Sequence, residues 1–476
     1  MVDDDLCYLT ASEAVGLFKA RKVSPVELLE AVVARGEAIR ETINPFADTY
    51  YDEARQRARK AEEKYAKTDG RPRRLEGVPL AVKDTSAIRG KRATMGSMIY
   101  KDAIAERTDP DIERLIRSGA NIFTRTTCPE FGWLYTTQSR MWGVTRNPWR
   151  PDASPGGSSG GSAAALAAGA TILATGGDST GSIRQPASQC GVVGYQAPFG
   201  RIPMVGEASF SSYLHHGPMT RTVADAAVMA SIMSGPHPLD HNSLHRKVTI
   251  PADLKGIEGM KIAYSIDLGH YEVIDDVRRA TLESLDALRD AGAEVTEIPV
   301  DWAGEVIRLG HGSQEFLFAP GISDAVRNHG DIVSDYVPQL EETALSFDAD
   351  DYRRSLSLAA QVWDQHLGPM LRDHDVFITP TVSCPDIPAD GWQKDTITVN
   401  GKTLTDTDTA MTVLWNMFGR CPVLAVPSGM TVTGLPTGLQ VIGRVEDDVT
   451  VFRVAAALEE RRPWLDRPER RPNLAI

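Results

Sequence analysis

Residues Ser154 to Gln196 read SPGGSSGGSAAALAAGATILATGGDSTGSIRQPASQCGVVGYQ and carry the strongest signal in the sequence. A glycine- and serine-rich turn opens this stretch and leads into a small-residue segment, 160–169, that we predict to be a helix. Backbone amides at a helix N-terminus can face an anion or a developing negative charge. A second such turn, Gly176-Gly-Asp-Ser-Thr-Gly-Ser182, follows the apolar run Ile172 to Ala174. Two serine-bearing turns joined by one helix can share a pocket.

Two other kinds of site also use glycine- and serine-rich turns. A nucleotide phosphate loop would need the Lys and Ser/Thr of G-x-x-x-x-G-K-[ST], which are missing. A nucleophile elbow would use Gly157-Ser158-Ser159-Gly160-Gly161, with Ser159 as the nucleophile, but an elbow needs a buried strand directly before it. The preceding NPWRPDASP contains three prolines, which exclude that strand. A serine in the second turn is therefore the better candidate, because its own and neighbouring amides are free to bind an oxyanion.

Outside this stretch the chain alternates between short apolar strands and helices. We predict strands at 78–82, 121–124, 260–264 and 294–298, and helices at 110–118 and 275–290. The first 65 residues are predicted to be helical, with capping boxes that begin at Thr10 and Ser24. Residues 302–368 are also predicted to be helical, and they are the natural place for a cover over a substrate. Alternation of this kind indicates an α/β protein whose sheet has parallel neighbours covered by helices.

Composition narrows the function classes. The chain has 42% hydrophobic and 24% charged residues, ordinary values for a globular protein. Its net charge is −13 and no long cluster of Lys and Arg occurs, so we expect no nucleic-acid partner. The longest weakly polar run, 163–175, is shorter than the roughly 20 residues of a membrane span, so we expect no membrane partner.

The cysteines and histidines give no sign of a metal site or a disulfide framework. There are five cysteines, an odd number, and no C-x-x-C pair. His215 and His216 are adjacent, so in an extended segment they would point to opposite faces and could not both bind one metal. We therefore predict no metal and no cofactor. The acidic N-terminus, MVDDDLCYLT, does not resemble a signal peptide, and a cytoplasmic location is expected.

At these residues the sequence resembles the amidase signature family. The family pattern is G-G-S-S-G-G followed by a D-x-G-G-S-I-R-like turn, and the spacing from Ser158 to Ser182 matches it. The likeness extends over nearly the whole chain, through Gly77-Val-Pro-Leu-Ala-Val-Lys83-Asp84, Thr127-Cys-Pro-Glu-Phe-Gly132, Gly217-Pro-Met-Thr-Arg-Thr222 and Gly434-Leu-Pro-Thr-Gly-Leu-Gln-Val-Ile-Gly443.

The resemblance implies one large domain over residues 1–476, built on a mixed twisted β-sheet with helices on both faces. The signature core would span about 70–230, with about 302–368 as the helical substrate cover. Lys83, Ser158 and Ser182 would converge at the sheet edge as a catalytic triad. The resemblance also implies a cis peptide before Ser158.

The chemistry of such a triad can be argued from the residue types. A serine hydroxyl is a poor nucleophile until a base takes its proton, and neither glycine-rich motif contains a histidine. Lys83 ends an apolar strand, where burial would lower its pKa from about 10.4 toward neutrality. In the family-like mechanism Lys83 accepts a proton from Ser158, Ser158 accepts one from Ser182, and Ser182 attacks the acyl carbon. The same relay would protonate the leaving nitrogen, as amide cleavage requires.

The second turn is predicted to bind the oxyanion through the backbone amides of Ser179, Thr180, Gly181 and Ser182. Asp178 and Arg184 are predicted to support this loop by hydrogen bonds and ion pairing. Three residues depart from the family pattern, in which glycine, asparagine and lysine are usual at the positions of Thr180, Thr127 and Gln196. A β-branched residue resists positive φ, so we expect Thr180 to reshape the loop or to narrow its pocket.

The leading hypothesis is an amidohydrolase of small or medium amides, anilides or carbamates (urethanes), acting as a monomer or homodimer. The ending ALEERRPWLDRPERRP is similar to the branch that contains nylon-oligomer hydrolases, aryl acylamidases and urethanases. The alternative is the glutaminase A-type subunit of the tRNA-dependent amidotransferase, which shares GSIRQPA followed by GVVG. Against it, Gln196 and Pro198-Phe199 replace the Lys and Thr-Tyr expected there. A catalytically silent scaffold is disfavoured because all three triad residues are present.

Overall fold

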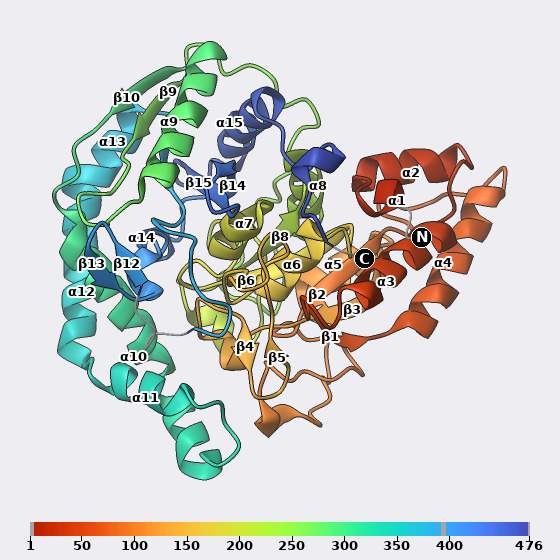
Figure 1. Cartoon of the computed structure of the whole chain (residues 1–476), viewed down its shortest axis with the longest axis horizontal. Coiled ribbons are helices and arrows are strands. Elements are labelled where there is room, and N and C mark those ends of the chain that lie inside the picture. The colour runs from red at the N-terminus through yellow and green to blue at the C-terminus, as the bar shows by residue number, and fades with distance from the viewer. Residues whose placement is uncertain (1–3, 392–396, 475–476) are drawn as a thin grey trace.

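An eleven-stranded mixed sheet forms the centre of the molecule (Figure 1). The computed structural model describes residues 4–391 and 397–474, and only the backbone of 207–208. Neighbours are parallel in β3–β2–β6 and in β11–β9–β10, and antiparallel elsewhere. In spatial order the strands are β1 (Phe46–Thr49), β3 (Asn121–Thr126), β2 (Pro79–Lys83), β6 (Leu173–Asp178), β8 (His215–Thr220), β7 (Val193–Gln196), β14 (Val423–Met430), β15 (Pro436–Gly443), β11 (Val376–Pro380), β9 (Lys261–Tyr264) and β10 (Glu294–Glu297).

Helices cover both faces of this sheet. Every residue of β2, β3, β6 and β15 is buried, which requires cover on each side. The covering helices are α5 (Pro110–Arg117), α6 (Gly160–Ala167), α7 (Arg184–Cys190), α8 (Val223–Met233), α9 (Asp275–Asp290), α14 (Val413–Met417) and α15 (Asp448–Arg461). The predicted α/β class, with a mixed helix-covered sheet in one domain, is confirmed.

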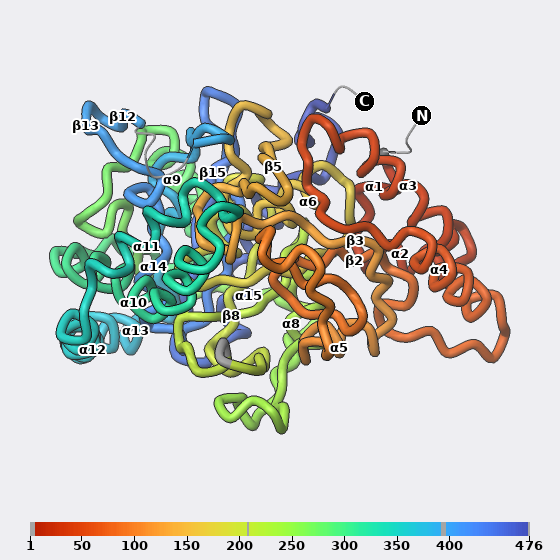
Figure 2. The backbone as a smooth tube through the Cα atoms, turned by 90° about the horizontal axis from the view of Figure 1, so that it is seen from below, coloured from red at the N-terminus to blue at the C-terminus, as the bar shows by residue number. Residues whose placement is uncertain are grey.

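The remaining α-helices gather at the two ends of the molecule (Figures 1 and 2). One end holds α1 (Asp4–Cys7), α2 (Ala11–Lys19), α3 (Pro25–Ala38) and α4 (Tyr51–Ala66), and the other holds α10 (Ala303–His329), α11 (Val337–Leu345), α12 (Ala349–Val362) and α13 (Gly368–Asp373). Both predicted capping boxes are present, at Thr10 with Glu13 and at Ser24 with Glu27.

The prediction that the first 65 residues are helical is wrong at one place, where β1 forms an edge strand. β1 pairs antiparallel with β3, and the ring of Phe46 packs edge-on against Phe123 at 5.9 Å between centroids. A strand of four residues between two helices leaves almost no trace in hydrophobic spacing. Its conformation is set by the sheet edge it joins, which sequence spacing does not reveal.

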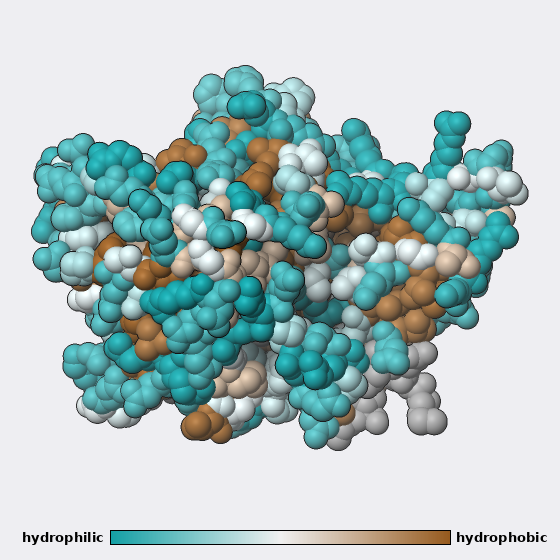
Figure 3. All heavy atoms as spheres, turned by 90° about the horizontal axis from the view of Figure 1, so that it is seen from above, coloured by the Kyte–Doolittle hydropathy of each residue, from teal (hydrophilic) through white to brown (hydrophobic). Residues whose placement is uncertain are grey.

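The visible surface is mostly polar. Figure 3 shows a face on which hydrophilic residues predominate and hydrophobic residues form small, separate groups. Within the described ranges, no helix combines the length and the apolar character needed to cross a membrane. This agrees with the short apolar runs of the sequence.

A buried carboxylate joins the segment between α10 and α11 to the loops that follow β2 and β3. Glu130 Oε1 accepts a hydrogen bond from Ser97 Oγ at 2.5 Å, and Oε2 accepts one from the amide of Ser334 at 2.6 Å. The amide of Glu130 in turn donates to the hydroxyl of Tyr336 at 2.6 Å. Glu130 is fully buried, so these partners replace the water it gave up.

We predict that Glu130→Leu destabilises the protein by roughly 2 kcal/mol or more, because it leaves the buried donors of Ser97 and Ser334 without an acceptor. Urea unfolding measures the change. Glu63→Leu, at an exposed position of α4, serves as the matched control and is expected to stay within about 0.5 kcal/mol of the parent. Equal unfolding midpoints for the two variants would contradict this role of Glu130.

Candidate active site

The predicted site lies where two parallel strands end. β2 and β6 are parallel neighbours, so their carboxyl ends meet at one edge of the sheet. Lys83 is the last residue of β2 and Asp178 the last of β6. The first serine-rich turn precedes α6, and the second connects β6 to α7. This is the edge at which α/β sheets usually bind ligands.

Lys83 and Ser158 are joined directly. The ammonium nitrogen Nζ of Lys83 donates to Ser158 Oγ at 2.8 Å and to the carbonyl of Gly177 at 3.3 Å. The peptide between Gly157 and Ser158 is cis. Lys83 is only 2% exposed, and this burial lowers its pKa to about 8, although Cys128 and Asp178 act in the opposite direction. A substantial fraction of this amine is therefore neutral in mildly alkaline solution.

Ser182 lies in the same pocket as Ser158 and Lys83. The two turns are tied together by the amide of Ser159, which donates to the carbonyl of Ser182 at 3.1 Å. Of the two hydrogen bonds expected in the triad, the described structure contains the one from Lys83 to Ser158. It contains none between the hydroxyls of Ser158 and Ser182. The three predicted residues thus lie in one pocket. The hydrogen bond from Lys83 to Ser158 is formed in the described structure, and the one between the two serine hydroxyls is not.

Three of the four predicted oxyanion amides are free. In the described structure the amides of Ser179, Thr180 and Ser182 have no hydrogen-bond acceptor, and all three residues line the pocket. The amide of Gly181 instead donates to Asp178 Oδ1 at 2.8 Å. The prediction that Gly181 presents its amide to an oxyanion is therefore wrong, because Asp178 already occupies it.

The predicted backbone conflict at Thr180 does not occur, while a narrower pocket at this residue stays a prediction. Thr180 has no positive φ, whereas Gly181 has a φ of 129°. A Cβ at Gly181 would lie 2.0 Å from Thr412 Oγ1, so that position admits only glycine. The expected conflict between a β-branched residue and the loop backbone is absent because the turn places its unusual conformation one residue later.

Asp178 and Arg184 hold the second turn in shape. The carboxylate of Asp178 accepts from the amides of Gly181, Ile183 and Arg184 at 2.8, 3.1 and 3.3 Å. It also pairs with the guanidinium of Arg184 at 3.0 Å, and both side chains are fully buried. Burial opposes the charge of Asp178, but Arg184 and the surrounding donors outweigh it and hold the pKa of Asp178 well below its usual range. This carboxylate therefore stays ionised.

Several supporting residues lie far away in the sequence and were not predicted. Asn416, on α14, donates to Asp178 Oδ1 at 2.8 Å and accepts from Arg184 at 2.6 Å. The carbonyl of Thr180 accepts hydrogen bonds from the hydroxyls of Thr412 and, at 3.4 Å, of Tyr135. Only Tyr135 lies near a recognised motif, Thr127 to Gly132. The others carry no local signal, because their roles depend on chain segments that meet only in the fold.

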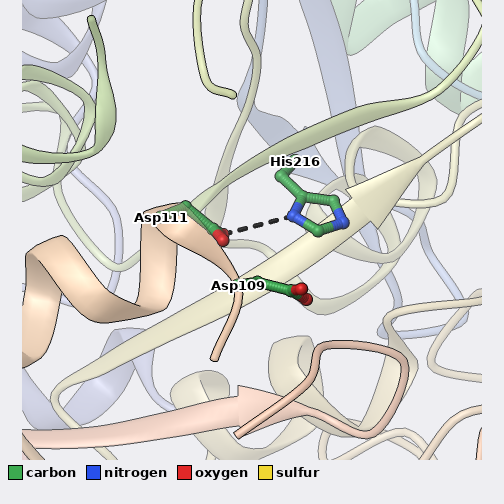
Figure 4. Close-up of side chains that lie close together, drawn as sticks. All are labelled: Asp109, Asp111 and His216. Carbon is green, nitrogen blue, oxygen red and sulfur yellow. Dashed lines mark ion pairs between the residues drawn. The ribbon is translucent and has the colours of Figure 1, made fainter. Parts of the chain in front are cut away.

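His215 and His216 point to opposite faces, as predicted. His215 Nδ1 contacts the carbonyl of Ala197 at 2.8 Å, while His216 lines the pocket and faces Asp111 at 3.3 Å (Figure 4). Asp109, Asp111 and His216 form a group in the described structure whose ligand atoms lie within 4.8 Å of one another, close enough to surround a metal ion. Burial disfavours a charged His216, yet Asp111 and Asp109 raise its pKa, so an ion pair also accounts for the group.

The pocket around these residues has a volume of about 540 Å³, suited to a small or medium organic molecule. Its reactive end contains Lys83, Ser158 and Ser182. Much of the remaining wall is apolar and includes Met95, Phe131, Trp133, Leu134, Leu214 and Phe318.

Comparison with known proteins identifies the family. A family model described as Amidase matches residues 27–452. The chain belongs to the amidase signature family. It is similar to an acylamidase of Rhodococcus erythropolis, at 32% identity over 98% of each chain. It is also 30% identical to the A-type subunit of a glutamyl-tRNA(Gln) amidotransferase from Geobacter metallireducens, over 97% of this chain and 98% of that one.

A solved structure supports the same assignment. The crystal structure of a bacterial aryl acylamidase of the amidase signature family superposes with a TM-score of 0.88, at 27% identity, covering 96% of this chain and 97% of that one. The resemblance inferred from the sequence motifs is thus confirmed. This amidase is a hydrolase of carbon–nitrogen bonds.

We predict that Arg184→Met destabilises this amidase by about 3 to 5 kcal/mol, because the ionised Asp178 would lose its buried partner. Urea or thermal unfolding measures the loss. Arg327→Met provides the control, since Arg327 and Asp324 form an exposed pair, with side chains 71% and 68% accessible. That pair is expected to contribute less than about 1 kcal/mol. A loss for Arg184→Met no larger than for the control would show that Asp178 does not depend on this ion pair.

Proposed function

We propose that this amidase hydrolyses amides of small or medium size, including anilides and carbamates, through an acyl-enzyme on Ser182. The observation that carries the proposal is the 2.8 Å hydrogen bond between the buried Lys83 amine and Ser158, in the pocket that also contains Ser182. A lysine with a pKa of about 8 can act as a base near neutral pH.

In this mechanism neutral Lys83 accepts the Ser158 proton while Ser158 accepts the Ser182 proton, and Ser182 Oγ attacks the acyl carbon. The second transfer requires the two serine hydroxyls to approach each other in the substrate complex, where catalytic hydrogen bonds often tighten. The relay then returns a proton to the leaving nitrogen. Water releases the acyl group by the same route in reverse.

The free amides of Ser179, Thr180 and Ser182 would bind the oxyanion of the tetrahedral intermediate. One donor of this kind contributes on the order of 3 kcal/mol to the barrier. Asp178 contributes indirectly, because it fixes the turn that presents these amides. Arg184 in turn positions Asp178.

The proposed substrate range follows from the pocket and the relatives. The apolar, aromatic wall favours aryl or alkyl groups, and one relative is named an acylamidase. Carbamates would use the same acyl-enzyme route. The alternative, glutamine hydrolysis for a tRNA-dependent amidotransferase, has the 30% identical relative in its favour and the aromatic wall against it. The region about 302–368 would act as the substrate cover, since α10 supplies part of the pocket wall.

A cytoplasmic location is proposed with this function, supported by five free, buried cysteines. The acting form is proposed to be a monomer or a homodimer. Turnover of p-nitroanilides, aryl carbamates, primary amides and glutamine, measured with the purified chain, distinguishes the substrate classes. Faster turnover of glutamine than of any anilide or carbamate would favour the amidotransferase alternative.

We expect a serine-directed fluorophosphonate to label Ser182, with labelling lost in Ser182→Ala and strongly reduced in Lys83→Ala. The matched control is Ser159→Ala, which removes the neighbouring hydroxyl of the rejected G-x-S-x-G motif and is expected to keep the label. Intact-protein mass spectrometry detects the adduct. Labelling that persists in Ser182→Ala and is lost in Ser159→Ala would overturn the assignment of the nucleophile.

The pH dependence of the hydrolysis rate should reflect the protonation state of Lys83. Because the base must be neutral, kcat/KM for an uncharged anilide is expected to rise with pH and level off above an apparent pKa of about 8. Below that value the rate constant should fall about tenfold per pH unit. Initial rates from about pH 6 to about pH 10, corrected for stability, test this. A rate that falls as pH rises through this range would exclude a neutral amine as the base.

A further inference from the structure

One face of α10 forms a wall of the pocket. His311, Gln314, Glu315 and Phe318 recur at the spacing of a single helix face, and all four line the pocket. The ring of Phe318 packs edge-on against Trp133, at 5.2 Å between centroids. This helix face therefore meets the same space as Ser182.

The same helix face is connected to the reacting loop. The hydroxyl of Tyr135 lies 3.4 Å from the carbonyl oxygen of Thr180 and 3.3 Å from His311 Nδ1. Glu315 follows His311 by four residues on the same helix face, a rise of about 6 Å along the axis. Since Ser182 and Glu315 line the same pocket, one bound substrate can contact both.

Glu315 lacks a partner in the part of the chain that the structure describes. Within the described residues its carboxyl group forms neither a hydrogen bond nor an ion pair, and burial alone raises its pKa to about 7. Two other acceptors of the pocket wall, Gln314 Oε1 and Asp406 Oδ2, are fully buried and have no hydrogen-bond donor among the described residues. Buried acceptors are nearly always satisfied, so two unsatisfied ones around a pocket that also contains an unpaired carboxyl group require an explanation.

The cationic side chains of the pocket are engaged elsewhere. Lys83 is held by Ser158 and Gly177, and the guanidinium of Arg107 donates to the carbonyl of Val205 at 3.3 Å. His216 faces Asp111. Burial lowers the pKa of His311 to about 4, so His311 is neutral near pH 7. None of the described pocket residues therefore supplies a positive charge that pairs with Glu315.

We propose that Glu315, together with Gln314 and Asp406, forms a subsite that binds a protonated primary amine carried by the amide substrate. An ammonium group brings one positive charge and three N–H donors, which matches a wall of three acceptors. The aromatic side chains of Phe131, Trp133 and Phe318 would contact the apolar chain between this amine and the scissile amide. The inference rests on the proposed function, because it names the substrate class of that same site.

The test measures binding in the Ser182→Ala protein by titration calorimetry, so that no turnover is needed. The probes are two matched pairs of amides of increasing chain length. In one pair the acyl chain ends in an ammonium or a methyl group, and in the other the chain on the leaving nitrogen ends in the same two groups. Only one position and one chain length need to place the ammonium group at Glu315. For that probe, the affinity is expected to be at least about tenfold higher than for its methyl partner.

Substitutions in the same background identify the group responsible. Glu315→Gln keeps the size of the side chain and should bring the ratio of the two affinities, ammonium probe over methyl probe, close to one. The ammonium probe should bind more weakly, and binding of the methyl probe should not change. Asp406→Asn should lower the ratio in part. Asp324→Asn alters an exposed carboxylate of the same helix and should leave it unchanged.

Equal binding of both members of each pair at every chain length would overturn the proposal, and so would a preference that survives Glu315→Gln. These outcomes are separate from failure of the proposed function. The subsite is tested in a protein without the nucleophile, whereas the acyl-enzyme is tested by labelling Ser182 in the parent protein.

Discussion

The hydrogen bond between the buried amine of Lys83 and the hydroxyl of Ser158 is the contact on which the rest of the site depends. It exists because β2 is buried at every residue and ends at Lys83, which delivers an amine into a position that disfavours its charge. A lysine at the surface would stay protonated and could not serve as a base. In the proposed mechanism the buried sheet is thus the reason that Lys83 can act as a base, and the helices on its two faces maintain that burial.

The second turn depends on a buried carboxylate that stays charged because hydrogen-bond donors surround it. Asp178 stays ionised inside the protein because backbone amides, Arg184 and Asn416 all donate to it. Arg184 also donates to the carbonyl of Thr412 and to Gln440 on β15, at 3.0 and 2.9 Å. One ion pair therefore joins the turn to α14 and to a distant strand. Because Asp178 takes up the Gly181 amide, the turn exposes the amides on either side of it to the pocket.

The sequence predicts the parts of this protein that local rules govern. Capping boxes, strands at 78–82 and 121–124, the helix at 275–290 and the two serine-rich turns were all predictable, since each depends on neighbouring residues. The strand β1 and the supporting roles of Thr412 and Asn416 were not, because they arise where distant segments pack. Even within the best motif the sequence could not show that Asp178 occupies the Gly181 amide. That depends on how the turn closes, which residue types alone do not determine.

The contrast between the carboxylates of Asp178 and Glu315 is informative about the pocket. Donors surround Asp178 and hold its pKa well below the usual range. Glu315 has no donor among the described residues, and burial raises its pKa to about 7. An unpaired carboxylate in the interior destabilises a fold, because the charged form loses hydration without gaining a partner. The protein supplies donors to Asp178, so donors could also have been placed near Glu315, Gln314 Oε1 and Asp406 Oδ2, where the described residues provide none. A wall that lowers stability in the free protein and gains its missing donors only from a ligand is what a binding site for a cation requires.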